Sequence, residues 1–109
     1  MKKKISIAIV TYNNERIIKQ TIESIIKHVE GLFDYVLYVI DNQSTDHTVN
    51  EVLRCDGNIV LIRNEKNIGF GAAHNKVIGL IDSEYHLVVN PDITIVNDVI
   101  LDMYNCIIR

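Results

Sequence analysis

One stretch of the sequence decides the fold, and it reads Tyr35-Val36-Leu37-Tyr38-Val39-Ile40-Asp41-Asn42-Gln43-Ser44-Thr45-Asp46. Its first half is an uninterrupted apolar run of strand-forming residues, which stops abruptly at the carboxylate of Asp41. Such a run predicts a strand that is buried on both faces, as in a parallel sheet. Asp41 would then lie at the carboxyl end of a buried strand, which is the edge of an open α/β sheet where ligands bind.

The same arrangement recurs along the chain. We predict four strands, at residues 5–10, 35–40, 58–62 and 85–89, each of them an apolar run. Thr11, Asn64 and Asn90 end the first, third and fourth runs as Asp41 ends the second. Because the carboxyl ends of parallel strands meet at one edge of a sheet, these four strand ends are expected to converge on one crevice.

Segments with helical periodicity separate and follow the strands. Their expected inward faces contain mostly apolar residues at helical spacing: Ile17, Ile18, Thr21, Ile22, Ile25, Ile26 and Val29; Val49, Val52 and Leu53; Ala73, Val77 and Ile81; Val99, Ile100, Met103, Tyr104 and Ile107. We expect N-caps at Asn14, at Ser44 or Thr45, and at Asn97 or Asp98, and a stop at Gly31. Strict alternation of strand and helix predicts an α/β fold, a parallel sheet of about four strands with helices on both faces.

Length and composition bound the possible functions. The chain has 109 residues, enough for one small domain, and its net charge of −3 gives no electrostatic case for binding nucleic acid. Cys55 and Cys106 lie far apart and match no metal spacing, so we expect reduced, structural thiols. Neither a signal peptide nor a run of about 20 apolar residues is found. We therefore expect a cytoplasmic protein, or one at the inner face of the membrane.

Two motifs fall short of known nucleotide fingerprints. Gly69-Phe70-Gly71 opens a helix after a strand, but His74 stands where a third glycine belongs, and the loop follows the third strand instead of the first. The phosphate-binding pattern Gly-x-x-x-x-Gly-Lys-Ser/Thr is absent from the sequence. The histidines share no metal-ligand spacing. His28, His47 and His86 are interpreted as surface or capping residues, and the role of His74 beside the glycines stays open.

A constellation of polar residues carries more weight than either motif. Asp41 and Asp92 could each serve only a turn or a helix cap. Both, however, fall on the sheet edge that also has Thr11-Tyr12-Asn13 and the loop with Gly69 and Gly71. One carboxylate there can accept hydrogen bonds from a nucleobase or a ribose, and the other can hold Mg²⁺ or Mn²⁺ beside phosphates. The combination favours a nucleotide site over a purely structural role.

Four motifs in order make the sequence resemble the family 2 glycosyltransferases over nearly its whole length. They are residues 7–13 (Ile-Ala-Ile-Val-Thr-Tyr-Asn), 39–46 (Val-Ile-Asp-Asn-Gln-Ser-Thr-Asp), 64–75 (Asn-Glu-Lys-Asn-Ile-Gly-Phe-Gly-Ala-Ala-His-Asn) and 88–92 (Val-Val-Asn-Pro-Asp). The Asn-x-Gly-Phe-Gly loop and the Asn-Pro-Asp turn look most like the rhamnosyltransferase-type branch.

The resemblance implies a GT-A (Rossmann-like) fold and a nucleotide-sugar donor, a UDP- or dTDP-sugar. By that resemblance, Thr11, Tyr12 and Asn13 would line the nucleoside pocket and Asp41 would bind the pyrimidine. Asn67, Gly69 and Gly71 would lie under the nucleotide. Asp92 would be the metal ligand of the family's Asp-x-Asp motif. Asn90 replaces the first aspartate of that motif and offers only a neutral oxygen, which puts the metal affinity in question.

The family further implies inverting transfer of the sugar to a saccharide or lipid-linked glycan. Its general base would lie beyond Arg109, so no catalytic base is assigned here. We therefore expect residues 1–109 to be the donor-binding part of a truncated glycosyltransferase domain. Such a part would be inactive alone and prone to self-association through Met103, Tyr104, Ile107 and Ile108.

Two other classes of protein remain as alternatives. A flavodoxin-like or receiver-like binding domain also places carboxylates at strand ends around Mg²⁺. It would need an acidic cluster after the first strand, where this chain has uncharged residues 11–14. A non-catalytic interaction module on the same scaffold is the third option, because a fold does not fix a function.

Overall fold

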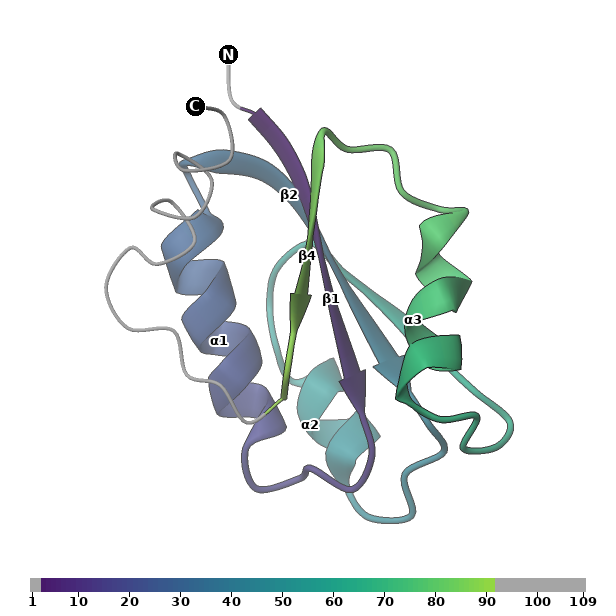
Figure 1. The fold of residues 1–109 in the computed structure, drawn as a ribbon. Coiled ribbons are helices and arrows are strands. Elements are labelled where there is room, and N and C mark those ends of the chain that lie inside the picture. The colour runs from purple at the N-terminus through teal and green to yellow at the C-terminus, as the bar shows by residue number, and fades with distance from the viewer. Residues whose placement is uncertain (1–2, 92–109) are drawn as a thin grey trace.

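The computed structural model describes residues 3–91. The expected last helix, its cap at Asn97 or Asp98, its apolar face and Asp92 lie outside the described residues. Strands and helices alternate along the described part in the order β1 (Lys3–Thr11), α1 (Ile18–Val29), β2 (Phe33–Asp41), α2 (Thr48–Leu53), β3 (Ile59–Arg63), α3 (Phe70–Ile78) and β4 (Tyr85–Val89). Figure 1 shows this order from purple to green.

The strands form one parallel sheet in the order β3-β2-β1-β4. The predicted four-stranded α/β fold is thus confirmed, and each predicted strand lies within two residues of the observed one. The register places Thr11 beside Asp41 and Asp41 beside Arg63, so the ends of β1, β2 and β3 are level. On the other side of β1, Ile9 pairs with Val89, which brings the end of β4 to the same edge.

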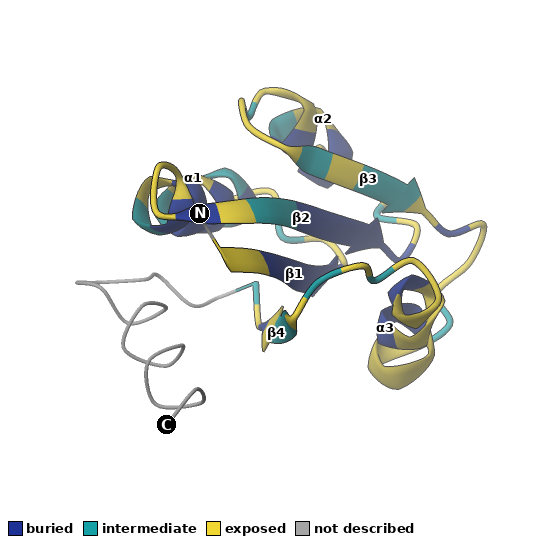
Figure 2. Cartoon of the chain, turned by 90° about the horizontal axis from the view of Figure 1, so that it is seen from above, coloured by how far each residue is buried: buried dark blue, intermediate teal, exposed yellow. Residues whose placement is uncertain are grey.

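Helices cover both faces of the sheet, as Figure 2 shows. The side chains of Ile7, Leu37 and Val39 pack in one buried cluster with those of α1 and with Val52 of α2. On the opposite face a smaller cluster joins the strands to α3: Ala8, Val10, Tyr38, Ile40, Ala73 and Val77. The central strands β1 and β2 are buried from both sides, which explains their continuous apolar sequences.

The two described N-cap predictions are wrong. Helix α1 begins at Ile18 with no side-chain cap, because Asn14 turns its Oδ1 back to accept hydrogen bonds from Thr11 Oγ1 at 2.7 Å and from the Tyr12 N–H at 2.9 Å. Helix α2 begins at Thr48, beyond both Ser44 and Thr45. Loop-to-loop contacts hold these polar side chains, and sequence spacing does not reveal such contacts.

The helix ends fit the sequence better. Gly31 follows α1 with φ +85, as its predicted role as a stop requires. Ala73 and Val77 are buried as expected, whereas Ile81 lies beyond the end of α3 and is only half-buried. Helix α3 begins at Phe70, within the Gly69-Phe70-Gly71 segment that is expected to open a helix. Within residues 3–91, the helices are all too short or too polar to cross a membrane.

Candidate functional site: the carboxyl edge of the sheet

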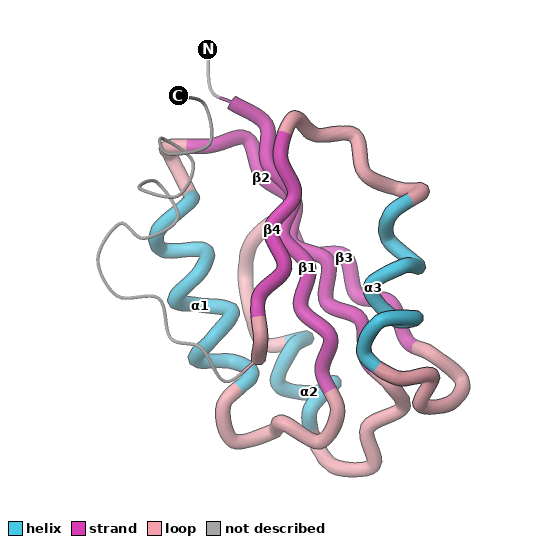
Figure 3. Tube along the Cα trace, in the orientation of Figure 1, coloured by secondary structure: helices cyan, strands magenta, loops and turns pink. Residues whose placement is uncertain are grey.

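The loops that follow β1, β2 and β3 gather at one end of the sheet, as Figures 1 and 3 show. Thr11, Asp41 and Arg63 end their strands side by side there. Backbone hydrogen bonds continue one step past the strands, from the Asn42 N–H to the Thr11 carbonyl at 2.9 Å and from the Asn64 N–H to the Asp41 carbonyl at 2.8 Å. The expected convergence of these strand ends is therefore present.

Asp41 is buried at this edge, with 1% of its surface exposed. Ser44 donates one hydrogen bond to each of its carboxylate oxygens, from the backbone N–H to Oδ2 at 3.0 Å and from the hydroxyl to Oδ1 at 2.5 Å. A carboxylate oxygen has a second lone pair, so each could still accept another hydrogen bond. Because Asp41 is buried, a ligand would reach these lone pairs only if the surrounding residues moved.

The loops after β1 and β2 are joined by hydrogen bonds. Asn13 accepts the Thr45 N–H on Oδ1 at 2.8 Å and donates its own N–H to Ser44 Oγ at 2.9 Å. The Asn14 N–H donates to Thr48 Oγ1 at 2.8 Å. Asn13 has φ +51, in the left-handed region that asparagine tolerates better than most residues. The two loops therefore form one polar platform at the sheet edge.

Members of the predicted Thr11-Tyr12-Asn13 group play different parts. Thr11 is fully buried, and its hydroxyl donates to Asn14, so its side chain supports the loop from below. Tyr12 is 46% exposed, and its ring is free to stack on a planar ligand. Asn13 is exposed, with its amide oxygen engaged by Thr45.

The glycine loop, residues 67–71, leads from β3 into α3. Asn67 Oδ1 accepts the Gly69 N–H at 2.9 Å, and Gly69 has φ +85, a conformation that favours glycine. A Cβ placed on either Gly69 or Gly71 would meet no atom within 4 Å, and a positive φ is found only at Gly69 of the two. The first N–H groups of a helix have no intrahelical partner, and no side chain caps those of α3. Gly71 thus leaves open space beside unsatisfied backbone donors.

The predicted metal site is only partly described. Asn90, directly after β4, is exposed, so its amide oxygen is open to a ligand. Asp92 lies outside the described residues. Within residues 3–91, no group of three His, Cys, Asp or Glu side chains is placed to hold a metal ion. Asn90 alone is a weak neutral ligand for a hard cation, so a site here needs the charge of Asp92.

Asp46, in the loop between β2 and α2, stabilises the polar platform. Its Oδ1 accepts the Thr48 N–H at 2.9 Å and its Oδ2 accepts the Glu15 N–H at 3.3 Å. Desolvation raises the pKa of Asp46, but the hydrogen bonds from Thr48 and Glu15 together outweigh it and hold the pKa below its usual value. The carboxylate is therefore charged at neutral pH and stabilises the loop between β2 and α2.

His74 is the least expected residue near the edge. Its side chain is buried on α3, its ring packs edge-on against Phe70 with centroids 4.4 Å apart, and neither ring nitrogen has a hydrogen-bond partner within the described part of the chain. Burial lowers the pKa of His74, and the charge of nearby His86 lowers it further. Burial also lowers the pKa of His86, whose Nδ1 lies 2.6 Å from Ser6 Oγ. Both rings are thus kept neutral near pH 7.

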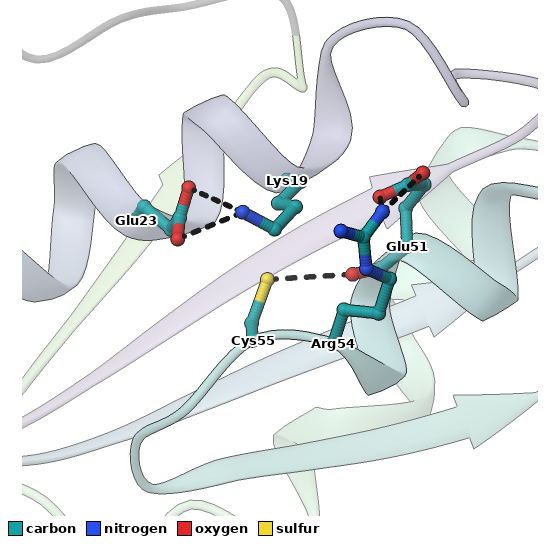
Figure 4. A network of polar contacts seen from close by, with 5 residues as sticks. All are labelled: Lys19, Glu23, Glu51, Arg54 and Cys55. Carbon is teal, nitrogen blue, oxygen red and sulfur yellow. Dashed lines mark hydrogen bonds and ion pairs between the residues drawn. The ribbon is translucent and has the colours of Figure 1, made fainter.

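The polar network around Cys55 lies apart from this edge, beside α1 and the end of α2 (Figure 4). The Cys55 thiol donates to the Glu51 carbonyl at 3.5 Å. Burial raises the pKa of Cys55 to about 11, helped by the charge of Glu23. A thiol that stays protonated at neutral pH is a poor nucleophile, which fits the predicted structural role.

Sequence reasoning missed the residues that hold the site together. Ser44 and Thr48 are the partners of Asp41 and of the first loop, and Asn42 and Asn64 form a buried amide pair behind them, which the exposed Lys76 contacts. The sequence does point to Asn42 and Asn64, because each asparagine directly follows the last residue of a strand. The partners of these amides depend on strand order, which the sequence pattern left open.

The sequence matches the family described as Glycosyl transferase family 2 over residues 6–109, and the chain belongs to that family. It is 30% identical to the uncharacterized glycosyltransferase MJ1057 of Methanocaldococcus jannaschii over 81% of this chain. It is 33% identical to a poly(ribitol-phosphate) beta-glucosyltransferase of Bacillus spizizenii over 94% of this chain. The chain spans 31% of the length of the first relative and 17% of the second.

Solved glycosyltransferase structures share the fold. TarS 1-349 of S. aureus in complex with UDP-GlcNAc superposes with a TM-score of 0.82 at 29% identity, covering 99% of this chain and 31% of that chain. A mannosyltransferase of Pyrobaculum calidifontis in complex with GDP-Man and Mn²⁺ has a TM-score of 0.81 at 19% identity, covering 93% of this chain and 31% of that chain, a likeness of fold alone. The predicted GT-A fold is confirmed, and family membership disfavours the receiver-like alternative.

Proposed function

We propose that residues 1–109 form the donor-binding part of an inverting glycosyltransferase that uses a UDP- or dTDP-sugar. The observation that carries the proposal is the buried Asp41 carboxylate, placed between the first loop and the glycine loop at the carboxyl edge of a parallel sheet. The UDP-GlcNAc complex of the similar TarS structure supports a uridine donor.

In this proposal the base of the nucleotide stacks on the exposed ring of Tyr12 and donates its N–H to Asp41. Binding requires the Ser44 loop to move, because Asp41 is buried and Ser44 contacts both of its carboxylate oxygens. Asn13 and Thr11 shape the pocket from the first loop, one through Thr45 and the other from below. A buried carboxylate suits a base N–H well, since a charged acceptor makes a stronger hydrogen bond than a neutral one.

The glycine loop takes the diphosphate side of the donor. Gly71 leaves room for a close approach, and the first-turn N–H groups of α3 offer donors and the positive end of a helix dipole. Gly69 supplies the backbone conformation that the loop needs, and Asn67 stabilises it. We place the phosphates there and the pyrimidine at Asp41.

Asp92, together with the exposed Asn90, would hold Mg²⁺ or Mn²⁺ against the diphosphate. Such an ion, when bound, offsets the charge that develops on the departing diphosphate. A solved glucosyl-3-phosphoglycerate synthase of Mycobacterium tuberculosis, 25% identical to this chain, is a complex with Mn²⁺ and UDP, which supports a divalent metal.

Sugar transfer itself belongs to the whole enzyme. A general base would take the proton of an acceptor hydroxyl while that oxygen attacks the anomeric carbon, with inversion. We assign no residue of this chain to the base. A saccharide or cell-surface glycan is the proposed acceptor, in keeping with the poly(ribitol-phosphate) beta-glucosyltransferase relative. The rhamnosyltransferase-like branch is proposed from sequence alone, from the glycine loop and from the Asn-Pro-Asp sequence of residues 90–92.

Calorimetric titration of the chain with UDP, dTDP and GDP in the presence of Mn²⁺ tests the proposal. We expect the pyrimidine diphosphates to bind and GDP to bind more weakly. Equal affinity for all three would remove Asp41 as a base-reading residue. No binding at millimolar concentration would overturn the donor-site assignment and favour a non-catalytic module.

A further inference from the structure

Two buried amide side chains lie behind the candidate site. Asn42 follows β2 and Asn64 follows β3, with 3% and 5% of their surfaces exposed. Asn64 Nδ2 donates to Asn42 Oδ1 at 2.7 Å. A buried amide is costly unless its donors and acceptors are paired, so the remaining partners of this pair decide what it does.

The partners fix the direction of every hydrogen bond in the network. Lys76 Nζ lies 2.6 Å from Asn64 Oδ1, and an ammonium group can only donate. Asn64 must therefore turn its oxygen to Lys76 and its NH₂ to Asn42. Asn42 in turn presents its oxygen to Asn64 and donates its own NH₂ to the Gly69 carbonyl at 3.2 Å. We call this Lys76–Asn64–Asn42–Gly69 sequence of hydrogen bonds the amide chain.

The amide chain ends at the residue that starts α3. The Gly69 carbonyl also accepts the first hydrogen bond of the helix, from the Ala73 N–H at 3.2 Å. The Ile68 N–H reaches Asn42 Oδ1 at 3.5 Å. The Asn42 side chain therefore links the glycine loop by hydrogen bonds to the end of β2, one residue after Asp41, where Ile68 also packs against the buried cluster under α3.

Lys76 is unusual for a residue that orients buried groups. It is exposed, it lies in the last turn of α3, and it forms no ion pair within residues 3–91. An exposed lysine of this kind would ordinarily contribute little to the fold. Its ammonium group instead fixes, together with the Gly69 carbonyl at the other end, which way two buried amides point.

We propose that Lys76, Asn64 and Asn42 are positioning residues that set the glycine loop relative to Asp41, and thereby set the affinity for the nucleoside diphosphate. The proposal rests on the proposed function for its ligand, and its first half concerns the loop alone. Without the lysine, Asn64 Oδ1 loses its charged donor, and only the Gly69 carbonyl still fixes the direction of these hydrogen bonds, so the Asn42–Gly69 contact is weakened.

The test compares Lys76→Met with Lys76→Arg and with the control Lys27→Met. Lys27 lies in the last turn of α1, so the control removes the same charge from the same kind of helix position. Loss of the amide chain should raise the dissociation constant for UDP about fivefold or more, equivalent to one ordinary hydrogen bond. Arginine only donates, so Lys76→Arg should restore the affinity, and Lys27→Met should leave it unchanged.

Hydrogen exchange without ligand tests the loop directly. Lys76→Met should speed exchange of the Gly69 and Ala73 amides about tenfold relative to Lys27→Met, with Val77 as the internal reference. Unchanged exchange at both amides would overturn the proposal, whatever the nucleotide data. Faster exchange with wild-type affinity for UDP would overturn its second half. A wild-type chain that binds no UDP would overturn the proposed function, and exchange would still decide the role of Lys76.

Discussion

Replacing Asp41 by asparagine separates the two duties of this carboxylate, holding the loop and binding a ligand. Asp41 accepts two hydrogen bonds from Ser44, at 3.0 and 2.5 Å, and is 1% exposed. Asparagine is nearly isosteric and can keep both contacts if the Ser44 hydroxyl turns to accept from the new NH₂. The charge is lost, so the free energy of unfolding should fall by about 1–2 kcal/mol, part of the value of hydrogen bonds to a charged group.

The matched variant is Ser44→Ala, which removes the hydroxyl donor and leaves the carboxylate in place. It also removes the acceptor of the Asn13 N–H, so its loss of stability should be similar, about 1–2 kcal/mol. Its effect on binding should be opposite, because the freed Oδ1 becomes available to a base. Urea denaturation gives both stabilities, and calorimetric titration with uridine gives both affinities.

We expect Asp41→Asn to weaken uridine binding about tenfold or more, equivalent to about 1.4 kcal/mol. Ser44→Ala should bind uridine as well as the wild type or better. Equal losses of affinity in the two variants would show that Asp41 acts only through the loop. Wild-type affinity in Asp41→Asn would refute the reasoning outright.

Three further predictions concern other residues of the site. Gly71→Ala should raise the free energy of unfolding by about 0.5–1 kcal/mol, since glycine is unfavourable in a helix. It should also weaken UDP binding, because the new methyl group fills open space beside the backbone. Unchanged affinity for UDP in titrations would contradict a close approach of the diphosphate to the backbone at Gly71. Because the pKa of His74 is lowered in the folded chain, the unfolded chain binds the proton more readily, and the free energy of unfolding should fall as the pH drops below 6.5. His74→Leu should reduce this pH dependence in urea titrations at pH 7.5 and 5.5, and the part that is due to His86 should remain. An unchanged pH dependence in His74→Leu would contradict the burial argument. Asp92→Asn should lower the affinity for UDP in the presence of Mn²⁺ and leave the affinity for uridine unchanged. Equal losses of affinity for both ligands, measured by calorimetry, would contradict a metal-binding role.

The fold class was predictable because the local periodicity of apolar residues indicates which segments are strands and which are helices, and their alternation indicates a parallel sheet. The apolar run before Asp41 and its three counterparts specify strands, of which β1 and β2 are the buried ones, and the helical segments between them favour parallel connections. The order β3-β2-β1-β4 was beyond reach, because every strand is about equally apolar. Helix starts failed at Asn14 and at Ser44 for one reason: each side chain found a partner outside its own helix.

The candidate site was predictable in position and less so in detail. Strand ends locate Thr11, Asp41 and the glycine loop at one edge without any structure. The sequence does not show that Ser44 closes over Asp41, because that contact depends on the turn geometry at Gln43, which has φ +60. It also hides the pairing of Asn42 with Asn64, which needs β2 and β3 to be neighbours.

Amide chemical shifts recorded during titration with UDP and Mn²⁺ test the central claim most directly. The account predicts that the largest changes fall at Tyr12, at Asp41 and Ser44, and in the glycine loop, at the carboxyl edge of the sheet. Residues 82–84 at the opposite edge should be unaffected and serve as the internal control. Changes confined to that opposite edge, or none with UDP or dTDP at millimolar concentration, would contradict a nucleotide-sugar site on this chain.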